Sequence, residues 1–141
     1  MTVYVDRSDP RTLHPLHTVL LAGTIPLFLG ALLSDWAYWF SYQVQWTNFA
    51  SWLIAGGLIF TGLALVCAVI GLFSSDRAPA LIVYPVLLMT TLVLGFINAL
   101  VHAKDAWASM PTGLILSGVV FVLALLATWI RLSSARRGAF K

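Results

Sequence analysis

Residues 49–73 read FASWLIAGGLIFTGLALVCAVIGLF and contain no charged side chain. Roughly 20 apolar residues in a helix are enough to cross the hydrocarbon core of a bilayer, and this run is longer. Only helices and closed barrels satisfy all of their backbone hydrogen bonds in lipid, and a long uninterrupted apolar run is typical of a helix. The stretch therefore predicts a membrane-spanning helix.

Three further apolar runs have the same character, at about residues 16–40, 80–101 and 110–130. Pro15 precedes the first run, at a helix start, where the missing N–H of proline costs nothing. The connections between the runs are short, which forces consecutive helices to lie antiparallel. We therefore expect an all-α, integral membrane four-helix bundle of up-down-up-down topology over residues 16–130, with an N-terminal tail (1–15) and a basic C-terminal tail (131–141).

The composition agrees with a protein embedded in lipid. Of the 141 residues, 60% are hydrophobic and 9% are charged, whereas a soluble domain carries roughly 25% charged residues. The mean hydropathy is +0.93. The single cysteine, Cys67, excludes a disulfide within the chain. Because no phosphate-binding loop, nucleophile elbow, H-E-x-x-H or C-x-x-C motif occurs, we expect no enzyme activity.

The basic residues indicate how the helices are oriented. Seven of the eight Lys and Arg residues lie in the two tails and the second loop, and only Lys104 lies on the other side. The positive-inside rule then places both termini in the cytoplasm. Basic residues confined to tails do not indicate nucleic-acid binding. Aromatic residues cluster near the opposite, outer side and predict an interfacial belt there: Trp36, Tyr38, Trp39, Tyr42, Trp46, Trp52 and Trp107.

Small residues follow one face of the second and fourth spans. In lipid, such faces usually mark close helix packing. On the second span the face consists of Gly57, Thr61, Ala64, Ala68 and Gly71, and on the fourth it consists of Gly113, Ser117, Ala124 and Thr128. We expect both faces to be packing seams rather than binding sites.

Polar residues lie on one stripe of the first span and one stripe of the third. The first stripe is His17, Thr24, Phe28, Ala31 and Asp35, and the third-span stripe is Tyr84, Leu88, Thr91, Gly95, Asn98 and His102. Asp35 and His102 should reach nearly the same depth, because both helices run outward over similar lengths. We predict an outer polar pocket formed by Asp35, Asn98, His102, Lys104 and Asp105. The alternative is that Asp35 reaches headgroup water and His102 only caps its helix.

The histidines are the candidate metal or haem ligands. His14 and His17 are three residues apart, so both lie on one side of the helix start and could hold a metal. The alternative is a capping role for His14 and an interfacial one for His17. A haem held between these residues and His102 is not expected, because a whole span of roughly 30 Å separates them. A haem b bound through His102, with Met110 as second ligand, is the alternative to no cofactor.

Several short motifs are similar to those of a known family. They are His14-Pro15-Leu16-His17, Pro26 and Asp35 in the first span, residues 97–107 (INALVHAKDAW), and Pro111-Thr112-Gly113-Leu114. Over residues 12–130 the chain resembles the bacterial membrane family known as domain of unknown function 2231. The resemblance implies a four-span protein of the bacterial inner membrane, and relatives accompany periplasmic redox modules. Many members carry a histidine at the start of the third span, which this chain lacks.

Three functions are compatible with these features. The first is a non-enzymatic structural, accessory or anchor subunit that packs with itself or with a partner in the inner membrane. The second is a haem- or quinone-linked electron-transfer domain that serves a periplasmic redox partner. The third is a small transporter or ion-handling protein, for which four spans with few charges provide a thin pathway.

Overall fold

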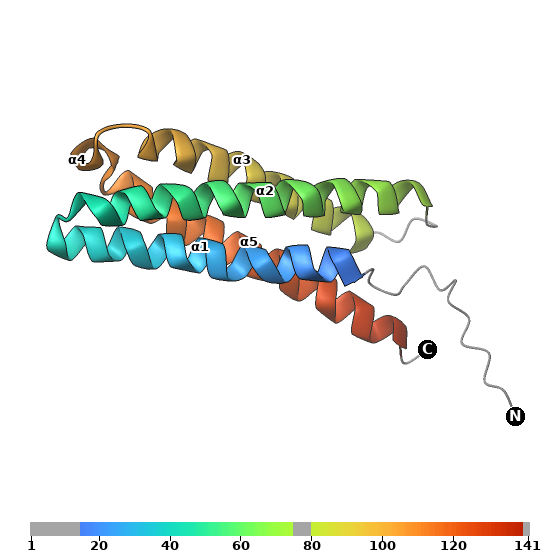
Figure 1. Ribbon diagram of the computed structural model, residues 1–141. Helices are drawn as coiled ribbons and strands as arrows, with labels where there is room; N and C mark the ends of the chain where they lie inside the picture. The colour runs from blue at the N-terminus through green and yellow to red at the C-terminus, as the bar shows by residue number, and fades with distance from the viewer. Residues whose placement is uncertain (1–14, 75–79, 140–141) are drawn as a thin grey trace, which may run out of the picture.

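The computed structural model describes residues 15–74 and 80–139, and these residues form helices joined by short connections (Figure 1). Four helices are long: α1 (Pro15–Ser41), α2 (Val44–Ser74), α3 (Ala80–His102) and α5 (Thr112–Ala139). A one-turn helix, α4 (Ala106–Ser109), lies between α3 and α5. No strand occurs within the described ranges, so the predicted all-α fold is confirmed.

The four long helices form a closed ring of antiparallel neighbours. α1 packs along α2, α2 along α3, α3 along α5, and α5 returns to α1. The α1–α2 turn and α4 lie together at one end of the bundle, called here the hairpin end (Figure 1). α1 begins and α5 finishes at the opposite end. The predicted up-down-up-down bundle is therefore confirmed.

All four long helices are membrane spans by length and hydropathy. The qualifying segments are Pro15–Ser41, Val44–Phe73, Ile82–His102 and Thr112–Ser134. Only about a third of each span is buried inside the bundle. The remaining surface is lined by leucine, isoleucine, valine and phenylalanine side chains, which contact the acyl chains of the bilayer.

Two helix boundaries differ from the prediction. α2 begins at Val44 rather than Phe49, because Tyr42 and Gln43 alone form the turn after α1. Tyr42 adopts a left-handed conformation (φ 54°), and its N–H donates to the carbonyl of Tyr38 at 2.8 Å, which closes the last turn of α1. α5 continues to Ala139 instead of ending at Ile130, since residues 131–139 are rich in alanine and arginine, which favour a helix.

The two polar stripes both face the interior. Every member of the first-span stripe is buried, from His17 to Asp35, and the third-span stripe is buried from Tyr84 to His102. Between their polar ends lie two apolar clusters. One centres on Leu21, Leu88 and Ala127, and the other on Phe28 and Val120. The bundle thus has an apolar middle and polar residues toward both ends.

The small-residue face of α2 packs over most, but not all, of its predicted length. Gly57, Thr61 and Ala64 are buried, and Ala68 is partly buried against the core. Gly71 is exposed, and a Cβ atom added there would meet no atom within 4 Å. Among residues 15–74 and 80–139 no helix packs against Gly71, which lies near the end of the 31-residue α2, so the seam ends before this predicted member.

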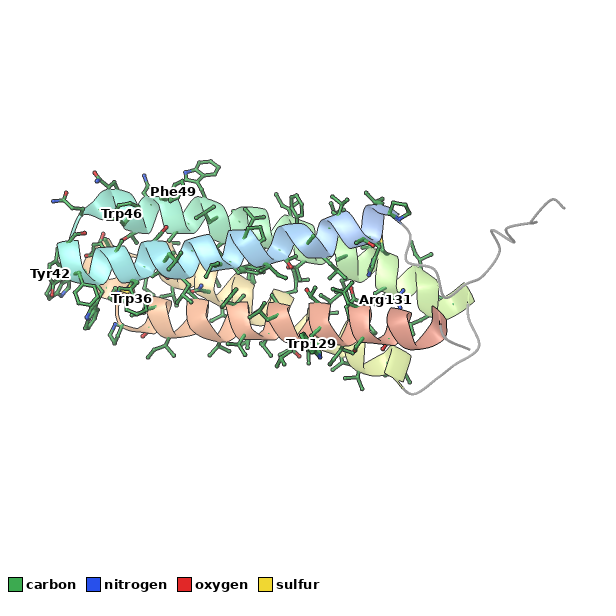
Figure 2. All side chains as sticks on the ribbon, turned by 90° about the horizontal axis from the view of Figure 1, so that it is seen from below. Trp36, Tyr42, Trp46, Phe49, Trp129 and Arg131 are labelled. Carbon is green, nitrogen blue, oxygen red and sulfur yellow. The ribbon has the colours of Figure 1, made fainter. Side chains whose placement is uncertain are left out.

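The predicted aromatic belt lies at the hairpin end, with one exception. Figure 2 shows Trp36, Tyr42 and Trp46 there, and all three rings are exposed. Tyr42 also stacks on Trp107 across the two connections, with ring centroids 6.2 Å apart. Tyr38 is 5% exposed and belongs to the core, so its assignment to the belt was wrong.

Candidate functional site: a buried polar cluster

Asp35 is the centre of a polar cluster inside the bundle, close to the hairpin end. It lies on the inward stripe of α1 and its side chain is fully buried. One carboxylate oxygen, Oδ1, is 2.8 Å from Nε2 of His102 at the end of α3. The other oxygen, Oδ2, accepts a hydrogen bond of 2.5 Å from the Ser117 hydroxyl of α5. A single carboxylate therefore joins three helices.

His102 is fixed from three sides. Its Nδ1 lies 2.9 Å from the backbone carbonyl of Asn98, one turn back on α3. Its Nε2 faces Asp35, and Gly113 of α5 lies against the ring. A Cβ atom at position 113 would come within 2.8 Å of Cε1 of His102. Glycine at this position therefore lets the start of α5 approach the imidazole closely.

Asn98 and Ser117 complete the cluster. The Asn98 amide nitrogen donates to the Ser117 hydroxyl oxygen at 2.9 Å. Ser117 in turn donates its proton to Asp35, so this one hydroxyl both accepts and donates. The Asn98 side-chain oxygen, Oδ1, is buried and has no hydrogen-bond partner among the described protein atoms.

The hydrogen bonds fix where the protons can lie. A carbonyl oxygen only accepts, so the contact with Asn98 requires that Nδ1 of His102 carries a proton. The 2.8 Å contact between Nε2 and Asp35 then needs one further proton, held by either partner. The pair is an imidazolium beside a carboxylate or a neutral imidazole beside a carboxylic acid. In both forms the pair is neutral overall, which lowers the cost of its burial.

The structure brings together three of the five residues predicted for the outer polar pocket. Asp35, Asn98 and His102 are in contact, and the alternative in which Asp35 reaches headgroup water is wrong. Lys104 and Asp105 are exposed and lie outside the hydrogen-bonded cluster. They follow the end of α3, and Asp105 precedes α4 without capping it through its side chain.

Ser117 is a cluster member that the sequence pattern predicted only as part of a packing face. Its hydroxyl could have predicted that Ser117 belongs to the cluster, because a polar group at membrane depth needs a hydrogen-bond partner. A second serine on α1, Ser34, is bonded instead to the carbonyl of Gly30 in its own helix. Serine alone therefore does not distinguish a cluster member from a residue bonded within its own helix.

His17 belongs to a different group of residues, toward the opposite end of the bundle. Its Nε2 is 2.8 Å from the Tyr84 hydroxyl of α3, a contact that the sequence did not predict. The guanidinium of Arg131 lies 5.8 Å from the centre of the Tyr84 ring. Figure 2 shows Arg131 far from Trp36 and Tyr42 along the bundle. His14, the other candidate ligand, lies outside the described residues.

The described histidines do not converge on a metal. His17 and Asp35 are eighteen residues apart on α1, about 27 Å along the helix axis. His102 lies beside Asp35, so the expected separation of His17 from His102 is confirmed. Within residues 15–74 and 80–139, no group of three or more His, Cys, Asp or Glu side chains has the arrangement of a metal site.

The fold and the buried cluster define an α-helical membrane protein with four spans. The chain belongs to the family described as "Predicted membrane protein (DUF2231)", whose model matches residues 13–133. That range includes the whole polar cluster. Neither a curated protein nor a solved structure matches the chain. The family resemblance noted in the sequence is therefore confirmed.

Proposed function

We propose that this protein is a non-enzymatic module of a bacterial inner-membrane assembly, in which the buried cluster fixes three helices against one another. The observation that carries the proposal is the bonding of Asp35, whose two oxygens contact His102 and Ser117 on two different helices. Apart from Asn98 Oδ1, the polar side-chain atoms of the cluster have partners among the described atoms, and such paired networks rigidify a core and specify one arrangement. A rigid bundle with an apolar outer surface suits an anchor or accessory subunit.

The cluster contains serine, histidine and aspartate, but the order in which these side chains are hydrogen-bonded argues against nucleophilic catalysis. In a catalytic triad the histidine lies between the other two, so that it takes the proton of the serine. Here the carboxylate lies between, and the Ser117 hydroxyl donates to Asp35 rather than to the imidazole. Ser117 is also buried, which leaves no room for a substrate beside its oxygen.

The middle of the bundle argues against a transport pathway. The side chains of Phe28 and Val120 fill the level between the two polar ends. Four buried threonines share this interior, and each donates its hydroxyl proton to a backbone carbonyl of its own helix: Thr24, Thr61, Thr91 and Thr128. These hydroxyls are therefore not lined up to pass an ion from one helix to the next.

The electron-transfer alternative requires a free imidazole nitrogen. Both ring nitrogens of His102 have protein partners, and Nε2 of His17 contacts Tyr84. Binding of a haem b iron by His102, or by Nε2 of His17, would break one of these buried contacts. This weighs against haem, and we propose a module without a resident cofactor.

The charge distribution supports an orientation with the hairpin end outside. Lys104 is the only Lys or Arg in the connections at that end, whereas the tails and the second loop carry the rest. In this orientation both termini are cytoplasmic, and the exposed aromatic residues lie at the outer headgroup level. A periplasmic partner, or a second copy of the chain, would meet the module there.

Extraction of the protein from native membranes into nanodiscs tests the proposal. We expect native mass spectrometry to detect an assembly of fixed stoichiometry that is heavier than the 15.4 kDa chain. The same sample should show no Soret absorption, and liposomes that contain it should show no added proton or ion flux. A lone chain with a Soret band, or with saturable flux, would contradict the accessory role.

A further inference from the structure

A polar cavity of about 200 Å³ opens beside the buried cluster, between the start of α2 and the end of α3. Thr47, Asn48 and Ser51 of α2 line one wall, and His102, Lys104 and Ala106 line the other. A single water needs only about 15 Å³ of such space, whereas drug-sized ligands occupy about 300 Å³ or more. The cavity therefore fits a small polar molecule or a single functional group of a larger one.

Thr47 is the residue that indicates a ligand. It is 4% exposed, and its hydroxyl has no hydrogen-bond partner among the described atoms. The other four buried threonines, in the bundle interior, each donate a hydrogen bond to a backbone carbonyl of their own helix, and Thr47 does not. Ser51, which also lines the cavity, does bond its own helix, because its hydroxyl donates to the Thr47 carbonyl at 2.9 Å. Thr47 lines the cavity as a residue, and a buried hydroxyl without a partner is costly unless a bound molecule bonds to it.

The charges around the cavity favour an anion. Lys104 supplies a positive charge, and the first turn of α2 supplies the positive end of a helix dipole. The lining includes no carboxylate. The nearest buried one, Asp35, lies behind His102 and is already bonded to His102 and Ser117. The side chains of both members of the pair are fully buried, so the Asp35 carboxylate adds no exposed negative charge to the cavity wall.

We propose that this cavity binds one small oxyanion, with the Thr47 hydroxyl donating to it and Lys104 neutralising it. The proposal goes beyond the accessory role and does not depend on it. A phosphate group is the chemistry that fits. It has two sources at this depth, namely a free anion from the aqueous side and the headgroup of a phospholipid.

Calorimetric titration with inorganic phosphate tests the site, using the full-length protein in phosphatidylcholine nanodiscs at ionic strength matched with chloride. We expect saturable binding that weakens about fivefold in Thr47→Val, which removes one hydroxyl and keeps the side-chain shape. Lys104→Gln should weaken it at least as much. Thr90→Val is the matched control, because Thr90 is exposed on α3 and bonds its own helix, so its affinity should be unchanged.

The Asp105→Asn variant distinguishes specific binding in the cavity from non-specific attraction of phosphate to positive charge. Asp105 is exposed and does not line the cavity. If positive charge alone attracted phosphate, Asp105→Asn would strengthen binding by as much as Lys104→Gln weakens it. Specific binding in the cavity predicts a large change in phosphate affinity for Lys104→Gln and a small one for Asp105→Asn. Thermal unfolding of each variant verifies that the bundle is intact.

Native mass spectrometry of the same variants identifies the source. If a headgroup occupies the cavity, phosphate does not titrate in, and a phosphatidylglycerol molecule stays bound to the wild type and is lost in Thr47→Val and in Lys104→Gln. If a free anion is the ligand, phosphate binds and no lipid is retained. The proposal is overturned if neither phosphate nor lipid binds, or if Thr47→Val and Thr90→Val behave alike, since the cavity then holds only water.

Discussion

At the scale of single residues, a buried carboxylate is stabilised by hydrogen-bonding partners on both of its oxygens. Asp35 lies at membrane depth with its side chain fully buried, and each of its oxygens has a polar contact. A charge left unpaired in such a place is strongly destabilising, whereas a paired and hydrogen-bonded one is tolerated. The stability of the cluster should therefore depend on pairs rather than on individual side chains.

The losses of stability on removing Asp35 and on removing His102 should not add up, because the two side chains are partners. We expect Asp35→Ala and His102→Ala each to lower the free energy of unfolding by about 3 kcal/mol, because each leaves a buried group without its partner. The double variant should lose clearly less than the sum. Reversible unfolding in bicelles measures all three, with the exposed Lys104→Gln expected to change stability by about 0.5 kcal/mol or less.

Additive losses in this cycle, within about 0.5 kcal/mol, would mean that the two side chains do not interact. That result would remove the physical basis for treating the cluster as one unit.

At the scale of the helices, α1 and α2 fit together through glycine and phenylalanine in both directions. The Phe28 ring of α1 lies over Gly57 of α2, and the Phe60 ring of α2 lies over Gly23 of α1. Small residues allow such close approach, which drives helix association where water is absent. The long α1–α2 contact thus depends on two positions at which no side chain is present.

Gly57→Ala tests this fit. The added Cβ would lie 2.5 Å from Cε1 of Phe28, whose ring is itself buried. We expect a loss of about 1–3 kcal/mol in the free energy of unfolding, which is typical of overpacking. Gly71→Ala on the same helix is the control, because its Cβ would meet nothing within 4 Å. Equal stabilities of the two variants would argue that the Phe28 contact does not hold the helices together.

The sequence predicted the helices and their inward faces better than their ends. The stripes that carry Asp35 and His102 were recognisable because a helix in lipid must turn its polar residues toward protein. The start of α2 was not recognisable, because Val44–Asn48 is polar enough to be taken for a loop. The cavity at Thr47 follows from that unpredicted first turn of α2. Likewise, the contact between His17 and Tyr84 depends on how two helices are rotated, which hydropathy does not report.

At the scale of the whole molecule, polar residues lie toward both ends of a bundle whose middle is apolar. The hairpin end has the Asp35 cluster and the cavity, and the opposite end has His17, Tyr84 and Arg131. The two ends are therefore chemically different. Which of them faces the outside decides where a partner or an anion can reach the protein.

Labelling of introduced cysteines determines the orientation. In a Cys67→Ser background, Ala103→Cys should react with a membrane-impermeant maleimide on intact cells, because Ala103 is exposed at the hairpin end. Ser8→Cys should react only after the cells are permeabilised. Ser109 is a poorer probe because it is fully buried. Labelling of Ser8→Cys, but not of Ala103→Cys, on intact cells would reverse the proposed topology.

The most direct test of the account is the state of His102 in a bilayer. Solid-state NMR of the labelled protein can detect the protons on both ring nitrogens and the closeness of Nε2 to the carboxyl carbon of Asp35. We predict a protonated Nδ1 and a through-space correlation between Nε2 and Asp35, as the 2.9 Å and 2.8 Å contacts require. An Nδ1 without a proton, or the absence of that correlation, would contradict the existence of the cluster on which the proposed module is built.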